Sequence, residues 1–146
     1  MYKLVILSLF LIGCTETKNK TTNSPGVMKD VVIKSIEVIN TGGQLGSHSR
    51  MLIDKDSTHY RLTVAANPAD NSEYHKKTVP KDWKDLTAQI NLAEFRSSEE
   101  GKSVQPVDGV DTQIIIISDV DTISKMNAYN NKIWKSIVEH VYDDRK

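Results

Sequence analysis

Apolar and polar side chains alternate strictly between residues 58 and 64. Tyr60, Leu62 and Val64 fall on one face of this stretch, and three polar side chains fall on the other. Strict alternation of this kind is typical of a strand in an antiparallel sheet that buries one face. The segment therefore predicts a half-buried strand.

Four further segments are rich in β-branched residues or bounded by turn-forming residues, and we expect each to be a strand: residues 31–40, 50–54, 113–118 and 122–126. The segment 113–118 contains four consecutive isoleucines, so apolar side chains lie on both of its faces, as in a central strand. If helices cover one face, either Ile114 and Ile116 or Ile115 and Ile117 face the other. Exposed apolar side chains often mark an interaction surface, unless polar loops cover them.

Helical spacing occurs in two places. Residues 81–91 place Trp83, Leu86 and Ile90 at positions i, i+3 and i+7, which is the apolar stripe of an amphipathic helix. A second stripe runs through residues 131–141, whose first residue is an asparagine, a common helix cap. We therefore expect one helix in the middle of the chain and one near its end.

The predicted order of elements is β-β-β-α-β-β-α, with polar loops at residues 65–77 and 96–109. This order predicts an α+β domain over residues 30–146, in which two helices pack on one face of an antiparallel sheet of about five strands. The length of 146 residues fits one such domain.

The first residues have the pattern of an export signal. Lys3 precedes an apolar run over residues 4–12, which is too short for a transmembrane helix and typical of a signal peptide. Residues 11–14, LIGC, match the lipobox of bacterial lipoproteins. The resemblance implies that residues 1–13 are removed and that Cys14 becomes a lipidated N-terminus, which anchors the protein to a bilayer in the bacterial cell envelope.

Residues 14–29 are polar, contain Pro25-Gly26 and show no apolar period, so we expect a flexible tether. Fully extended, about fifteen residues span about 50 Å. Removing 13 of the 146 residues leaves 133, and takes away one of 19 basic residues and none of the 19 acidic ones. A mature net charge of −1 gives no electrostatic reason to expect a nucleic-acid partner.

The sequence TGGQLGSHSR holds three glycines between two predicted strands. A phosphate-binding P-loop would need Lys and Ser or Thr after its last glycine, and a dinucleotide site would open a helix. Adjacent side chains on a strand face opposite ways, so a local Ser-His pair is not expected. The glycines are better explained by positive φ angles in a connecting loop, and such loops often bind partners. The candidate partner-binding residues are Gly42, Gly43, Gln44, Leu45, Gly46, Ser47 and His48.

No motif indicates a metal, a cofactor or a catalytic set. The four histidines lack metal-ligand spacing, and Cys14 is the only cysteine, so its lipidation leaves no thiol for disulfides, metals or catalysis. Three pairs of aspartates, at 54 and 56, 108 and 111, and 119 and 121, are explained by turns and do not continue as calcium loops. We therefore expect a protein that is not an enzyme and needs no cofactor.

The order of elements resembles the emfourin family of small bacterial inhibitors of thermolysin-like metalloproteases. The features that carry this resemblance are a first strand that runs into Gly42-Gly43-x-x-Gly46, a central helix, Asp111 before an apolar strand, and a C-terminal helix. Together they span residues 33–141. The resemblance implies a non-catalytic domain that binds a protease through its loops.

The leading hypothesis is a small, membrane-anchored envelope lipoprotein whose domain binds another protein or a ligand without catalysing a reaction. One alternative is a tethered inhibitor of a thermolysin-like metalloprotease. Another is an enzyme of unidentified type, which would need a cleft that brings His48 or His75 near a carboxylate. A purely structural role in the envelope is also open.

Overall fold

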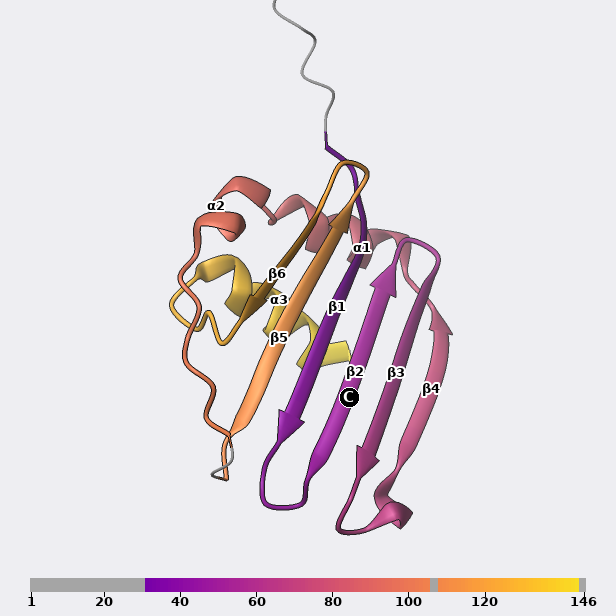
Figure 1. The fold of residues 1–146 in the computed structure, drawn as a ribbon. Coiled ribbons are helices and arrows are strands. Elements are labelled where there is room, and N and C mark those ends of the chain that lie inside the picture. The colour runs from indigo at the N-terminus through magenta and orange to yellow at the C-terminus, as the bar shows by residue number, and fades with distance from the viewer. Residues whose placement is uncertain (1–30, 106–107, 145–146) are drawn as a thin grey trace, which may run out of the picture.

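The computed structural model describes residues 31–105 and 108–144 (Figure 1). The predicted signal peptide, Cys14 and the tether at residues 14–29 lie outside these residues. Within the described ranges, no helix has both the length and the apolar composition to cross a membrane.

The architecture is α+β, as predicted, and its sheet is antiparallel throughout. The strand order is β4-β3-β2-β1-β5-β6. The strands are β1 (Ile33–Gly42), β2 (Ser47–Asp54), β3 (Ser57–Val64), β4 (Ser72–Lys77), β5 (Val110–Ser118) and β6 (Thr122–Met126). The helices are η1 (Pro68–Asp70, 3-10), α1 (Pro80–Ala88), α2 (Leu92–Ser97) and α3 (Lys132–Asp144).

The sheet has six strands rather than about five, because β4 forms inside the segment that the sequence predicts to be a polar loop. This edge strand shows no buried alternation; five of its six residues are exposed, and only Tyr74 is half-buried. Its pairing with β3 places Tyr74 beside Tyr60, and the two rings stack with centroids 5.2 Å apart. A solvated edge strand leaves little apolar signal in a sequence.

The central helix is two short helices instead of one over residues 81–91. Asn91 separates them, because its side-chain oxygen accepts hydrogen bonds from the N–H groups of Ala93 and Glu94 and caps α2. The C-terminal helix begins after the predicted cap, since the Asn131 side chain accepts a hydrogen bond from the Trp134 N–H at 3.0 Å.

All three α-helices lie on one side of the sheet (Figure 1). Ile114 and Ile116 face the helices and are fully buried, whereas Ile115 and Ile117 face the other side, where Ile117 is 37% exposed. The core between the layers contains side chains from four strands and from all three helices, among them Phe95 and Trp134, whose rings stack. Ile115 and Ile117 are therefore the pair that points away from the helices.

Candidate functional site

The glycine loop, residues 42–46, joins β1 to β2. Gly42, Gly43 and Gly46 have φ angles of 117°, 78° and 59°, a region that residues with a Cβ rarely adopt. The N–H of Gly46 donates to the carbonyl of Gly43 at 3.0 Å and closes a tight turn. The prediction that these glycines supply positive φ angles to a connecting loop is confirmed.

Neighbouring segments hold the glycine loop on both sides. The Gly43 N–H donates to the Gly109 carbonyl at 2.9 Å, and the Ala66 N–H donates to the Leu45 carbonyl at 3.1 Å. A Cβ at Gly42 would lie 2.5 Å from the Gly109 carbonyl oxygen, so this position requires glycine. On this fixed backbone, Leu45 is 57% exposed.

Ser47 and His48 are the first residues of β2, and their side chains lie on opposite faces of the sheet. The Ser47 hydroxyl donates to the Gly42 carbonyl at 2.9 Å. His48 Nδ1 lies 3.1 Å from the hydroxyl oxygen of Thr41, its register partner. The two side chains therefore form no nucleophile–base pair, as strand alternation predicts.

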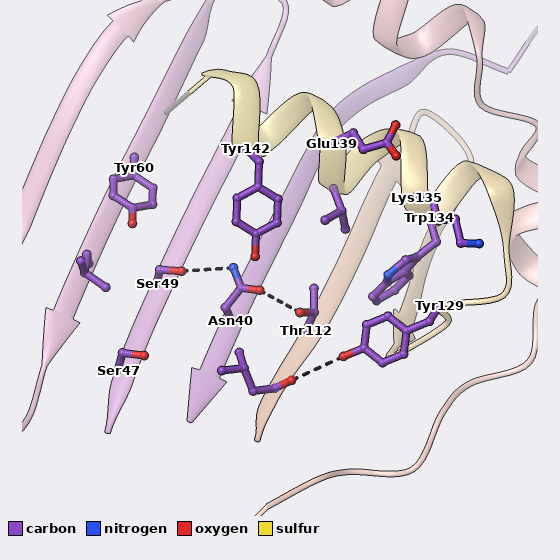
Figure 2. Close-up of a pocket in the computed structure, with 13 residues that line it drawn as sticks. Asn40, Ser47, Ser49, Tyr60, Thr112, Tyr129, Trp134, Lys135, Glu139 and Tyr142 are labelled. Atoms are coloured by element: carbon purple, nitrogen blue, oxygen red, sulfur yellow. Dashed lines mark hydrogen bonds between the residues drawn. The ribbon is translucent and has the colours of Figure 1, made fainter. Parts of the chain in front are cut away.

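A groove opens beside the glycine loop on the helix-covered face, between α3 and strands β1, β2, β3 and β5 (Figure 2). Its volume is about 650 Å³, which lies within the range of small-ligand sites. We call it the α3 groove. Its walls are aromatic and aliphatic, its floor carries small polar side chains, and two charged residues lie on its rim: Asn40, Ser47, Ser49, Tyr60, Leu62, Val110, Thr112, Tyr129, Trp134, Lys135, Val138, Glu139 and Tyr142.

A row of three polar side chains forms part of the groove floor. The strand register places Asn40 between Ser49 on β2 and Thr112 on β5. The Asn40 amide donates to the Ser49 hydroxyl at 3.2 Å, and the Thr112 hydroxyl donates to the Asn40 side-chain oxygen at 2.8 Å (Figure 2). These small, mutually bonded groups fill less volume than Val38, Met51 and Ile114 of the neighbouring row, which leaves room above them.

Trp134 and Tyr129 form one wall of the groove. Their rings meet edge to face, with centroids 6.2 Å apart. Trp134 is 1% exposed, and its indole N–H has no hydrogen-bond partner among the described residues. A buried indole N–H usually finds an acceptor, so this group is a candidate donor to a ligand.

A hydrogen-bonded clamp fixes the backbone behind this wall. Asn127, at a φ of 51°, accepts hydrogen bonds from the Thr112 N–H and the Tyr129 hydroxyl and donates to the Asp111 carboxylate. The hydroxyl of Ser103, the N–H of Val104 and the Asn127 amide all donate to Asp111 and lower the pKa of its carboxyl group below the ordinary value of 3.8. The clamp thereby ties the loop before β5 to the groove wall.

The histidines do not gather into one site. His59 and His75 stack on the face without helices, with ring centroids 3.8 Å apart, whereas His48 lies beside Thr41 and His140 lies on α3. Among residues 31–105 and 108–144, no three His, Cys, Asp or Glu side chains lie close enough together to hold a metal ion. The aspartates at 54 and 121 serve turns or ion pairs, as Asp54 accepts from the backbone of Asp56 and Ser57.

The α3 groove was not predicted from the sequence. Its strongest sequence signal is Asn40, which continues the alternation of Ile36 and Val38 but replaces an apolar side chain with an amide. A second signal is the pair Ser47 and Ser49, which continues the helix-facing positions of β2. The aromatic wall comes from α3 and the segment just before it, about ninety residues away in sequence, and only the fold brings it to this floor.

No protein-family model matches the chain, and no curated protein is significantly similar to it. The resemblance to emfourins stays a prediction from motif and element order. The function is therefore argued from the glycine loop and the α3 groove.

Proposed function

We propose that this protein is a non-catalytic, lipid-anchored binding protein of a bacterial cell envelope, which presents its glycine-loop end to a protein partner. The observation that carries the proposal is that three exposed apolar side chains lie at this end of the domain. Leu45, Val110 and Tyr129 are 57%, 41% and 50% exposed. Apolar groups left in solvent on a fixed backbone are typical of an interaction surface.

The position of this surface supports the proposal. β1 begins at Ile33, close to where the chain enters the described domain, and ends ten residues later at the glycine loop (Figure 1). A strand of that length spans about 33 Å. With the lipid at Cys14, the glycine loop would lie at the end of the domain that is farthest from the tether, where a partner has access.

The rigidity of the loop supports it further. Binding costs free energy when flexible loops must be ordered, and a loop already fixed by backbone hydrogen bonds avoids most of that cost. The contacts to Gly109, Ala65 and Ala66 fix the glycine loop in the free protein. Leu45 can therefore act as a pre-oriented anchor for a hydrophobic pocket of the partner.

A pair of charge substitutions tests the proposal. Leu45→Asp places a charge at the proposed surface, and Val120→Asp places one at a site that is also exposed, at 65%, in the turn between β5 and β6. Affinity capture from envelope extracts with the full chain should recover a partner with the wild type and with Val120→Asp, and at least tenfold less with Leu45→Asp. Equal recovery with both variants would contradict the proposal.

A second candidate function is inhibition of a thermolysin-like metalloprotease. The fixed loop that exposes Leu45 favours it, because a rigid loop can occupy a protease cleft and resist being cut, and the motif resemblance points to the same class of partner. The test is the rate of peptide hydrolysis by such a protease with increasing amounts of this protein. Dose-dependent inhibition that Leu45→Asp abolishes would support this function, and an unchanged rate would exclude it.

A further inference from the structure

The α3 groove has the chemistry of a site for an uncharged segment. No charged side chain forms its floor, and the two charged residues on its rim, Lys135 and Glu139, are of opposite sign and one turn apart on α3. An anion or a cation entering the groove would therefore meet one favourable and one unfavourable charge. Burial of an unpaired charge costs far more than burial of a neutral polar group.

Hydrogen-bond accounting shows what the groove still offers. The Trp134 indole N–H has no partner among the described residues. The Ser49 hydroxyl accepts from Asn40, and its own proton is not used in any bond to the described residues. Asn40 uses one of its two amide hydrogens for Ser49. Three hydrogen-bond donors near the polar row are thus unused, and acceptor oxygens on a ligand can satisfy them.

The walls of the groove favour a ligand that carries an apolar group next to its acceptor oxygens. Leu62 on β3 and Val138 on α3 face the groove, together with the rings of Tyr60 and Tyr142, and Figure 2 shows Tyr142 reaching from α3 over Asn40. An aliphatic or aromatic side chain of a partner would replace water against these groups, and burial of apolar area would stabilise it there.

We propose that the α3 groove binds a short peptide segment of the protein partner, with an apolar side chain against the tyrosine and valine walls, one backbone carbonyl accepting from Trp134 and another accepting from Ser49. The inference rests on the proposed function and names the chemistry of its partner. The backbone carbonyls match the unused donors of Trp134 and Ser49, and the neutral backbone matches the balanced charges on the rim. A sugar with an N-acetyl group shares the amide but lacks the apolar body.

The indole N–H signal of Trp134 gives a direct readout. The chain has two tryptophans, so Trp83→Phe assigns the signal of Trp134 without ambiguity. The full chain, labelled with ¹⁵N at tryptophan and held in detergent micelles, is titrated with N-acetyl-L-leucinamide to tens of millimolar. We expect the Trp134 indole proton to shift downfield as a carbonyl oxygen accepts its hydrogen bond.

Matched ligands and variants complete the test. N-acetyl-L-leucine, which adds a carboxylate, should bind at least tenfold more weakly, and N-acetylglucosamine should leave the signal in place. Ser49→Ala should weaken binding of the amide about fivefold, which is the effect of one lost hydrogen bond, and Val138→Trp should abolish it by filling the groove. A signal unmoved by the amide, or moved more strongly by the sugar, would overturn the inference. If Leu45→Asp still abolishes partner capture in that case, the proposed function stands and only the peptide assignment fails.

Discussion

One row of residues across β1, β2 and β5 consists of Val38, Met51 and Ile114. Two residues away on each strand, the next row consists of Asn40, Ser49 and Thr112. The first row is at most 2% exposed and packs beneath the helices. The second row is polar and hydrogen-bonded, and the α3 groove lies above it. The same strands thus supply the core at one position and a binding floor at the next, because the pleat brings every second residue to the same face.

The two rows separate the residues that stabilise the domain from those that line its groove. Apolar burial contributes about 25 cal/mol per Å² of area removed from water, so the first row carries a large share of the folding free energy. The second row makes hydrogen bonds whose net contribution is about 1 kcal/mol each. A protein selected only for stability would place apolar side chains there too.

The largest effect on stability is expected from a substitution in the first row. Ile114→Ala removes a fully buried side chain and leaves a cavity beneath α3, so the free energy of unfolding should fall by about 3 kcal/mol. Ser49→Ala, in the second row, should lower it by less than about 1 kcal/mol. Urea denaturation followed by circular dichroism measures both. Equal losses would show that the two rows do not differ in their energetic roles.

The next effect concerns the row after the polar one, which holds Ser47, Gly42 and Val110. Gly42→Ala forces a Cβ to 2.5 Å from the Gly109 carbonyl oxygen at a φ of 117°, and should destabilise the protein by about 2 kcal/mol. At Gly43 a Cβ would meet Val110 at an ordinary 3.5 Å, so Gly43→Ala should cost only about 1 kcal/mol of backbone strain. Thermal unfolding of the two variants checks this order.

A smaller effect sharpens the contrast between the rows. Ser49→Val places an apolar side chain on the groove floor and removes a hydroxyl that Asn40 uses. The gain in apolar burial and the lost hydrogen bond are each about 1 kcal/mol, so the melting temperature should change little while affinity for N-acetyl-L-leucinamide falls. Calorimetry and the indole signal measure the two quantities on one sample. A large loss of stability would assign the polar row to folding instead of binding.

The smallest effect is expected in the pH dependence of the melting temperature. Because three donors lower the pKa of Asp111 in the folded protein, its ionised form stabilises the fold above pH 3.8, and this contribution disappears as the pH falls through the lower folded value. Melting temperatures between pH 2 and 7 should therefore drop less steeply on the acid side in Asp111→Asn than in the wild type. Identical slopes would show that the clamp behind Tyr129 does not depend on this charge.

Much of the fold follows from local patterns. The alternation in residues 58–64 and the run of isoleucines identify β3 and β5, and the stripes near Leu86 and Ile137 identify helices, because periodic burial is written directly into the sequence. β4 was missed because an edge strand needs no buried face. The break between α1 and α2 was missed because the single cap at Asn91 sits inside an apolar stripe.

The candidate site was less predictable than the fold. The conformation of the glycine loop follows from its three glycines, but its contacts to Gly109 and Ala66 join segments that are distant in sequence. The groove depends on the register between β1, β2 and β5 and on the placement of α3, which no local pattern specifies. The local signs of it are Asn40 within an apolar alternation and the pair Ser47 and Ser49 on β2.

Site-specific photo-crosslinking in intact cells can locate the surface of the domain that contacts a partner. One form of the full chain carries the photoreactive residue at Leu45, and the control form carries it at Val120, which lies beside the entry of the chain, where the Asp119 N–H donates to the Val32 carbonyl. If the glycine-loop end is the binding surface, one dominant adduct should form from position 45 and none of that size from position 120. The same adduct from both positions, or an adduct from position 120 alone, would contradict the assignment of the binding surface to the glycine-loop end.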